Sequence, residues 1–456
     1  AVEQAHFSVD MPEGVALRYK AFHLEEPEVE GRSYTWTAKN LYPKYRAPYG
    51  PSATEMLPRV VLFPDRFEVE GTMGKSSTWA ELGKWKASLL EGKQDLPAAT
   101  IEAVKARVAD MKDWREKVAA VYAFVQEKTR YVSIQLGIGG WEPFPASFVD
   151  EKGYGDCKAL TNYTGALLSA VGISSHYALV RAGDDALPIL ADFPGNQFNH
   201  VILCVPKASD TIWLECTSQT APFDYLGAFT ADRDVLLLAG AKSGLCRTPS
   251  YPGPENQCLR NTTAALLPNG QLDLDLHATY EALRFDEVRA RAQAQARDQK
   301  TAFLDDHDFS GQYLHELSYE NTPNKPETVE KARLSLPGYA SATGSRMFIR
   351  PNPVNRLTSV PAPEDDRRQD FVIRQGEVDQ DRVEINLPEG FEVEHVPEPI
   401  NLKTKFAEYR SETEVKEGKM VYLRHLEWKA GRYPAAEFNA FADFTKKVAR
   451  ADQQRA

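Results

Sequence analysis

Apolar and polar residues alternate in several short stretches near both ends of the chain. The stretch VVLFPDRFEVEG (residues 60–71) alternates around a proline, and Pro, Gly and aromatic residues punctuate the sequence on either side. Residues 271–280 and 381–390 also place their apolar side chains on one face of an extended chain. A period of two predicts half-buried strands. We therefore expect β-rich, sandwich-like domains over residues 1–97 and 262–456.

The middle of the chain changes to a helical period. Residues 97–132 carry apolar side chains at three- and four-residue spacing, which predicts one or two amphipathic helices. A further helix is predicted from about residue 157 to 171, because Asp156 is a natural N-cap and Gly172 a natural residue just past a helix end.

Extended segments follow this helix. SHYALVRAG predicts a strand, and NHVILCV and DTIWLECT, on either side of PKAS, predict a β-hairpin. Helices followed by antiparallel strands are typical of an α+β fold. We expect this α+β core over residues 98–245 and a linker over 246–261. We also expect one helix near 286–304 to interrupt the C-terminal strands.

Composition narrows the classes of function. The 456 residues carry 54 Lys and Arg against 65 Asp and Glu, a net charge of −11, which argues against nucleic acid or an anionic membrane as a broad partner. No apolar run approaches the ~18–20 residues of a membrane helix. Five cysteines with no C-x-x-C pair are too few for a disulfide scaffold. Phosphate-loop and H-E-x-x-H motifs are absent, so we expect no cofactor and no metal.

One cysteine stands in a context that favours chemistry. In EKGYGDCKALTNYTG, Cys157 follows two glycines and Asp156 and begins the predicted helix. A helix N-terminus offers unpaired N–H groups and a partial positive charge, which favour the nucleophilic thiolate. Asp156 opposes ionisation of this thiol unless its own charge is used in capping. The alternative is an inert, packed cysteine, because most free cysteines are of that kind.

The predicted hairpin offers a base for this thiol. If PKAS is a four-residue loop, Val205 pairs with Asp210, and His200 lies directly opposite Glu215. Directly paired side chains share a face at ~4.5–5.5 Å, so Glu215 would hold the imidazole in one tautomer and stabilise its charged form. A register shift of one residue would separate them. The alternatives are a core or edge histidine and a solvated glutamate.

These residues resemble the transglutaminase-like superfamily. The motifs GDCK before a helix, FNHV on a strand and WLE on the next strand match its order of cysteine, histidine and acid. RYVSIQLGIGGWEPFPASFV and EINLPEGFEVEHVPEP resemble bacterial multidomain proteins, typical of the Bacteroides group, whose core lies between two β-rich domains of unknown function. The resemblance implies a papain/transglutaminase-like core and a Cys157–His200–Glu215 triad. The usual acid of the family is aspartate, and glutamate is one methylene longer.

The resemblance implies further features. Gln135 and Trp141 are candidates for holding the oxyanion beside the cysteine's own N–H, with side-chain packing as the alternative for each. A periplasmic or secreted location is implied, and with it a Cys246–Cys258 disulfide. The sequence begins AVEQAHFSVD and shows no signal peptide. Because relatives begin earlier, we expect residues 1–97 to be the C-terminal part of an N-terminal domain.

Three functions are compatible with these observations. The first is an enzyme for thiol-dependent acyl transfer or amide hydrolysis, acting on a peptide, a protein or a cell-envelope polymer. The second is a catalytically inactive fold that binds a peptide or glycan. The third is a structural protein of the bacterial cell envelope. The intact cysteine–histidine pair favours the first.

Overall fold

The computed structural model describes the chain apart from residues 135, 185, 209, 308 and 310. The protein is α+β and divides into two compact units. Unit 1 comprises Ala1–Tyr45 and Ser52–Ser250, and unit 2 comprises Arg46–Pro51 and Tyr251–Ala456.

The expected linker over 246–261 is only partly irregular. The division between the units falls inside it, after Ser250. Its last residues, from Gln257 on, already belong to strand β15, in which buried and less buried side chains alternate from Cys258 onward. The sequence just before Gln257 is rich in Pro and Gly, which indicates a loop and gave no sign of a strand that starts this early.

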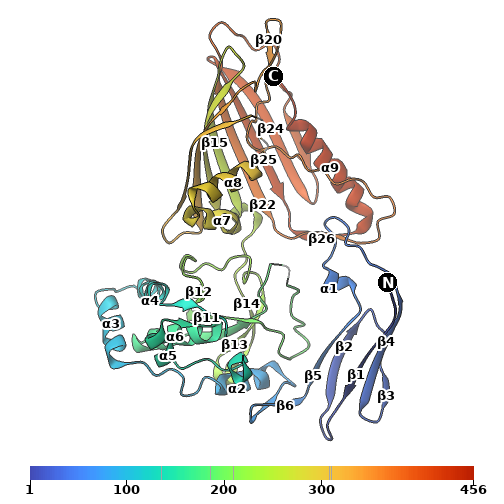
Figure 1. The fold of residues 1–456 in the computed structure, drawn as a ribbon, viewed down its shortest axis with the longest axis vertical. Helices are drawn as coiled ribbons and strands as arrows, with labels where there is room; N and C mark the ends of the chain where they lie inside the picture. The colour runs from blue at the N-terminus through green and yellow to red at the C-terminus, as the bar shows by residue number, and fades with distance from the viewer. Residues whose placement is uncertain (135, 185, 209, 308, 310) are drawn as a thin grey trace. The chain divides into compact units, whose positions relative to one another are not determined.

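The N-terminal part of unit 1 is β-rich (Figure 1). Strands β1, β4 and β3 form one antiparallel sheet, and the pairs β2–β5 and β6–β7 form two ribbons. Trp36 of β4 is buried, with its ring edge-on to Tyr19 of β2 at 5.1 Å between centroids. The elements are β1 (Val2–Asp10), β2 (Leu17–Phe22), β3 (Glu28–Glu30), β4 (Ser33–Leu41), α1 (Ala53–Met56), β5 (Arg59–Pro64), β6 (Arg66–Val69) and β7 (Thr72–Lys75).

The remainder of unit 1 is built on a five-stranded antiparallel sheet in the order β12–β11–β10–β13–β14. The region with helical spacing forms two helices, α3 and α4, and the predicted helix at Cys157 is confirmed as α6. Helix α6 packs against β11 and against α3, α4 and α5. The helices are α2 (Trp79–Ser88), α3 (Ala98–Val108), α4 (Trp114–Lys128), α5 (Ala146–Lys152) and α6 (Cys157–Ala170), with η1 at Gly137–Gly140 and η2 at Gly240–Lys242. The strands are β8 (Arg130–Tyr131), β9 (Tyr154–Gly155), β10 (His176–Val180), β11 (His200–Lys207), β12 (Asp210–Leu214), β13 (Asp234–Leu238) and β14 (Gly244–Arg247).

Helix α2 lies before residue 98, where we expected the α+β core to begin. It nevertheless packs against β13 and β14 of the five-stranded sheet. Its buried residues include Leu82, Trp85 and Lys86. Only two of these are apolar, so the helix gives a weak periodic signal in the sequence.

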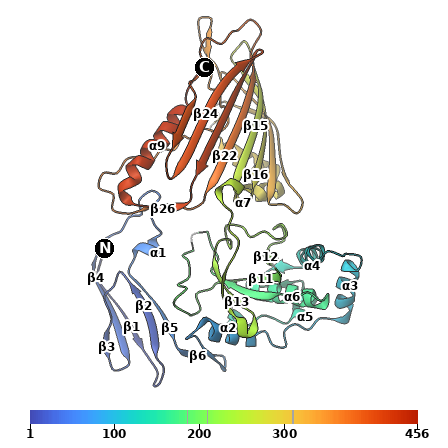
Figure 2. The same cartoon turned by 180° about the vertical axis from the view of Figure 1, so that it is seen from behind.

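Unit 2 contains one eight-stranded sheet in the order β17–β18–β16–β15–β22–β25–β24–β23 (Figure 2). Strands β15 and β22 are parallel, and all the remaining neighbouring pairs in this order are antiparallel. The strands are β15 (Gln257–Leu266), β16 (Leu272–Glu281), β17 (Tyr313–Asn321), β18 (Glu327–Leu336), β22 (Glu377–Asn386), β23 (Ile400–Lys403), β24 (Ala407–Lys416) and β25 (Lys419–Trp428). Two small ribbons add β19 (Ser341–Thr343) with β20 (Arg346–Phe348), and β21 (Phe371–Ile373) with β26 (Gly431–Tyr433).

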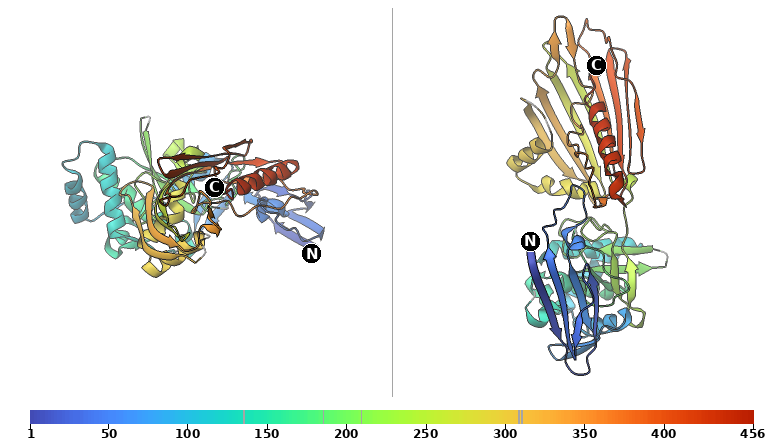
Figure 3. Two further views of the ribbon diagram at one scale, coloured as in Figure 1. Left: turned by 90° about the horizontal axis from the view of Figure 1, so that it is seen from above. Right: turned by 90° about the vertical axis from the view of Figure 1, so that its right-hand side faces the viewer.

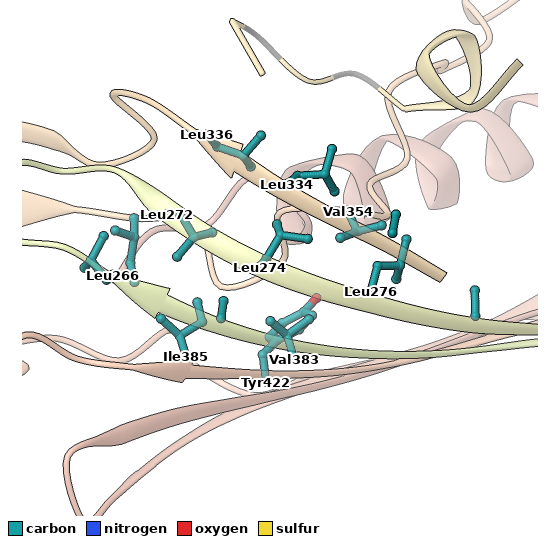
Figure 4. Close-up of a cluster of buried hydrophobic side chains, with 14 of the residues drawn as sticks. Leu266, Leu272, Leu274, Leu276, Leu334, Leu336, Val354, Val383, Ile385 and Tyr422 are labelled. Atoms are coloured by element: carbon teal, nitrogen blue, oxygen red, sulfur yellow. The ribbon is translucent and has the colours of Figure 1, made fainter. Parts of the chain in front are cut away.

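This sheet buries one face against helices, which corrects the expected sandwich of unit 2. Leucines of β16 and β18 form a cluster with Val383, Ile385 and Tyr422 (Figure 4). Val288 and Phe303, from the helical segment between β16 and β17, join the same cluster. A period of two shows that one face is buried but not what covers it, so the sequence could not separate a sandwich from a sheet covered by helices.

The helices of unit 2 also differ from the prediction. The single helix expected near 286–304 is two helices, α7 (Leu283–Val288) and α8 (Ala296–Asp306), separated by η4 (Arg289–Gln293). A long helix near the end of the chain, α9 (Phe438–Ala451), was not predicted. It lies along the sheet (Figure 3), and Phe438, Phe441 and Phe444 pack with Leu426 of β25. Short helices η3 (Gly253–Glu255) and η5 (Ala435–Glu437) complete the unit.

The expected Cys246–Cys258 disulfide is wrong. Both thiols are free. Cys246 is on β14 of the five-stranded sheet, whereas Cys258 is fully buried on β15 of the eight-stranded sheet. A spacing in sequence cannot show that two cysteines belong to different sheets. Within the described residues, no helix is long and apolar enough to cross a membrane.

Candidate active site

Cys157 is the first residue of α6, and Asp156 caps the helix. The Asp156 Oδ1 atom accepts a hydrogen bond from the backbone N–H of Ala159 at 2.9 Å. The other oxygen, Oδ2, forms an ion pair with Lys158. The charge of Asp156 is therefore used by the helix end and by Lys158, and less of it remains to oppose a thiolate at Cys157.

Two glycines bring the chain into this helix. Gly153 ends α5 in the left-handed region, at φ +67°. A Cβ atom on Gly155 would lie 2.9 Å from the Ala159 Cβ, so a larger residue would push α6 away. The N–H of Val132 donates to the Gly155 carbonyl at 2.9 Å, which holds the β8 segment beside the start of α6.

The β11–β12 hairpin has a register two residues away from the one expected. Lys207 pairs with Asp210, so the loop is two residues long, with Ala208 at φ +50°. Leu203 consequently pairs with Leu214 rather than with Ile212. Side chains alternate with a period of two, so a shift of two keeps His200 and Glu215 on the same side.

His200 and Glu215 are in direct contact beyond the end of this ladder. Nε2 of His200 donates to Oε2 of Glu215 at 2.9 Å and lies 3.1 Å from Oε1. Thr217 fixes the carboxylate, because its hydroxyl and its backbone N–H donate to Oε1 at 2.6 and 3.1 Å. The Tyr122 hydroxyl donates to the backbone carbonyl of Glu215 at 2.9 Å.

The imidazole of His200 contacts this carboxylate, and the thiol of Cys157 is near enough to influence its pKa. Burial lowers the pKa of His200, but the charge of Glu215 and hydrogen bonds with Cys157 and Glu215 raise it to about 10. Burial raises the pKa of Glu215, whereas the charge of His200 and hydrogen bonds with His200 and Thr217 bring it below its usual value. An imidazolium beside a carboxylate is therefore favoured at neutral pH. With Nε2 directed at Glu215, Nδ1 is the nitrogen available to the thiol.

The thiol borders a hydrophobic cluster rich in aromatic residues. Cys157 is 7% exposed and packs in a cluster with Trp85, Tyr177 and Val201. Trp141, one of the two oxyanion candidates, packs against this cluster, with its ring centroid 5.6 Å from that of Trp85. The other candidate, Gln135, lies outside the described residues.

The remaining cysteines lie in different surroundings. Cys204 and Cys216 are buried, and burial raises the pKa of each thiol to about 12. Burial also raises the pKa of Cys246 and of Cys258. Such thiols stay protonated near neutral pH and react slowly.

Three neighbours of the site escaped the sequence analysis. Thr217 holds Glu215, and Phe229, which is 50% exposed, packs its ring edge-on against His200 at 5.6 Å between centroids. Lys86 of α2 lies with its Nζ 4.3 Å from the ring centroid of Trp141. None of the three has a local pattern that sets it apart from ordinary loop or helix residues. Across the described ranges, no group of three or more His, Cys, Asp and Glu residues could hold a metal ion.

Comparisons with known proteins give one match to a family model and two matches to solved structures. Residues 345–456 match a family model described as a domain of unknown function with solved structure, DUF3858. No curated protein matches the chain. A crystal structure described as "a putative protease" from Parabacteroides distasonis superposes with a TM-score of 0.59 and 12% identity, over 99% of this chain and 72% of the other. At this identity, the likeness shows the fold alone.

A second crystal structure, described as "a putative cysteine protease" from Cytophaga hutchinsonii, has 11% identity and a TM-score of 0.23. The match covers 48% of this chain and 72% of the other chain. A TM-score this low carries no argument about the fold. The likeness in fold therefore rests on the first of the two structures, a bacterial protein described as a protease.

Proposed function

We propose that this protein is a cysteine-dependent hydrolase or acyltransferase that acts on amides. Cys157 is the nucleophile, His200 the base and Glu215 the residue that orients His200. One observation carries the proposal: His200 is hydrogen-bonded to Glu215, and the Cys157 thiol lies near enough to raise the pKa of the same imidazole. Nucleophile, base and orienting acid in contact are the components of covalent acyl transfer. The fold likeness to a protein described as a protease supports it.

Before the first half of the proposed reaction begins, the Cys157 proton already resides on His200 Nδ1, because Glu215 stabilises the imidazolium. The thiolate attacks the amide carbonyl carbon, and the carbonyl electron pair moves onto oxygen. When this intermediate collapses, the C–N bond breaks and the leaving amine takes the proton from His200. The product is a thioester on Cys157.

In the second half, water or an acceptor amine gives a proton to His200 and attacks the thioester. The C–S bond then breaks, and the proton stays on His200 beside the restored Cys157 thiolate. Water gives hydrolysis of the amide, and an amine gives a new amide bond. The chemistry of the site is the same in both cases, so the acceptor depends on which molecule reaches the thioester.

The oxyanion needs donors at the start of α6. We propose the backbone N–H of Cys157 as the first donor, because helix N-termini favour negative charge. Trp141 and Gln135 are the proposed second donors. The position of Trp141 against the Cys157 cluster supports its inclusion. This arrangement belongs to the transglutaminase-like core that we propose for residues 98–245.

We propose a peptide or protein substrate, or a cell-envelope polymer that contains peptide bonds, and a periplasmic or secreted location. The sequence resemblance to bacterial multidomain proteins supports both. Fractionation of the native organism, with an antibody against unit 2, tests the location. Recovery of the protein only with cytosolic markers would contradict it.

The enzyme proposal is tested with wild-type protein and the Cys157→Ala variant. Each is assayed against a panel of fluorogenic peptides and against glutaminyl substrates with a labelled amine. We expect turnover by the wild type, loss of it in Cys157→Ala, and retention in Cys204→Ala as the matched thiol control. Equal binding of these peptides by wild type and Cys157→Ala, without turnover by either, would support the inactive binding module instead.

A further inference from the structure

A buried lysine lies beside the aromatic side chains of the candidate active site. Lys86 of α2 is 8% exposed. Its Nζ lies 4.3 Å from the ring centroid of Trp141 and 5.2 Å from that of Trp85. The faces of indole rings attract an ammonium group, but they carry no net charge that could neutralise it.

Lys86 has no acidic partner among the residues that the structure describes. Two other lysines of unit 1 with limited exposure do have one, since Lys158 pairs with Asp156 and Lys128 pairs with Asp150. A desolvated ammonium without a counterion is costly. Burial, and secondly the charge of Lys158, accordingly lower the pKa of Lys86 to about 7. An anion bound next to Lys86 would favour its charged form again.

Lys86 and Cys157 border the same hydrophobic cluster. Trp85, the residue before Lys86, is buried in that cluster together with Cys157, and Trp141 packs against it. Lys158, the residue after Cys157, is close enough for its charge to act on Lys86. Trp85 and Trp141 thus connect the surroundings of the Lys86 ammonium to those of the Cys157 thiol.

We propose that Lys86, beside Trp85 and Trp141, binds a carboxylate of the substrate next to the amide that Cys157 attacks. The substrate class is then acidic amides, such as peptides with a carboxylate close to the scissile bond. Trp85 and Trp141 exclude water around the ion pair, which strengthens it. This inference rests on the proposed function, since it takes Cys157 as the point of attack.

The test uses thiol reagents in place of the unidentified substrate. Iodoacetate and iodoacetamide form one pair that differs by a carboxylate, and 3-maleimidopropionate and N-ethylmaleimide form a longer pair. Rates of modification at Cys157 are measured near neutral pH by site-resolved mass spectrometry, in wild type, Lys86→Met, Lys86→Arg and Lys84→Met. Lys84 is an exposed lysine on the same helix, so its variant controls for the loss of one charge.

The readout is the ratio of the anionic to the neutral reagent's rate, because His200 and the helix N-terminus act on the thiol in all four proteins. We expect Lys86→Met to lower this ratio about tenfold, the size of one hydrogen bond to a charged group. Lys86→Arg and Lys84→Met should leave it within about twofold of wild type, well below a tenfold change. Thermal unfolding checks that each variant is folded, and Lys86→Gln replaces Lys86→Met if the latter is not.

The outcomes separate the two proposals. If the ratio is unchanged without Lys86 while Cys157 still reacts faster than Cys204, the carboxylate subsite is wrong and the proposed nucleophile stands. If Cys157 reacts no faster than Cys204 with any reagent, the proposed function fails and the subsite fails with it.

Discussion

The Nε2 atom of His200 lies 2.9 Å from Oε2 of Glu215, although the two residues are not a pair of the β11–β12 ladder. The ladder ends at Leu203 and Leu214, and Glu215 turns back toward His200 from just beyond it. A glutamate, one methylene longer than the aspartate usual in the superfamily that the sequence resembles, spans this offset. The hydrogen bond is therefore a product of side-chain length as well as of strand register.

Replacing Glu215 by Gln tests the orienting role. The amide keeps the size of the side chain but removes the charge that stabilises an imidazolium at His200. We expect kcat to fall by up to about 10⁴, the loss found when the acid of such a triad is neutralised. Glu102→Gln, which neutralises an exposed carboxylate on α3, serves as the control. Equal activity of Glu215→Gln and wild type would contradict the role given to Glu215.

Thr217 is expected to act through Glu215. Its hydroxyl donates to Oε1 at 2.6 Å, and the nearly isosteric Thr217→Val removes only this bond. We predict a fall in kcat of about tenfold, comparable to one charge-assisted hydrogen bond, with KM nearly unchanged. The same substitution in a Glu215→Gln background should have less effect. Full additivity of the two substitutions would show that Thr217 acts elsewhere.

The stabilising effect of His200 should depend on pH. Its pKa is raised from 6.5 to about 10, so the protonated imidazole stabilises the fold fully below about pH 6.5 and this stabilisation is lost as the pH rises toward 10. The lowered pKa of Glu215 has the opposite sign, because its contribution is lost as the pH falls below the usual glutamate range. We compare the free energies of unfolding of wild type and His200→Gln across this range. The difference should be largest in mildly acidic solution. A difference that grows with pH would refute the assignment.

The five cysteines should separate by reactivity. Cys157 is expected to react with iodoacetamide first near neutral pH, whereas Cys204 and Cys216, with pKa values raised to about 12 by burial, should remain unlabelled in the folded protein. His200→Ala should slow labelling of Cys157 without exposing the other two. Peptide mapping after a short pulse measures all five sites at once. Simultaneous labelling of Cys157 and Cys204 would mean that the thiol at α6 has no special reactivity.

The stability of unit 2 should depend on Arg424. This buried guanidinium binds both oxygens of Asp452 at 2.9 and 3.0 Å and reaches Asp381 at 3.0 Å. Arg424→Met leaves Asp452 buried without its main partner, and we expect a loss of about 3–5 kcal/mol in the free energy of unfolding. Hydrogen exchange at β24 and β25 during urea titration follows the unit itself. Arg333→Met, which breaks an exposed pair with Asp275, should change little.

Local sequence signals located the start of α6 well but not the hairpin register. Asp156 is a cap by chemistry alone, so Cys157 could be placed at a helix N-terminus without a structure. The loop between Lys207 and Asp210 has Ala208 at positive φ, a conformation that alanine rarely adopts and that the sequence therefore does not predict. The contact of His200 with Glu215 survived this error because the register moved by two residues rather than by one.

Features that depend on tertiary packing were beyond the sequence. Lys86 looks like a solvated lysine of a polar helix, and only the packing of α2 near Trp141 makes it a buried charge. Helix α9 was missed although Phe438, Phe441 and Phe444 recur at three-residue spacing. The neighbouring strands had suggested that the β pattern continued to the end of the chain.

The short segment Arg46–Pro51 belongs to unit 2, although the chain on both sides of it belongs to unit 1. The N–H of Val372 donates to the Tyr49 carbonyl at 2.7 Å, and the Tyr49 ring lies 5.0 Å from that of Phe441. The backbone therefore passes between the units at three places, after Tyr45, Pro51 and Ser250. After proteolytic cleavage at Ser250, the N-terminal piece still contributes residues 46–51 to unit 2. A gene fragment that begins at Tyr251 therefore encodes an incomplete unit 2. Neither unit is encoded by one continuous stretch of sequence, so recombination could not exchange either of them in one piece.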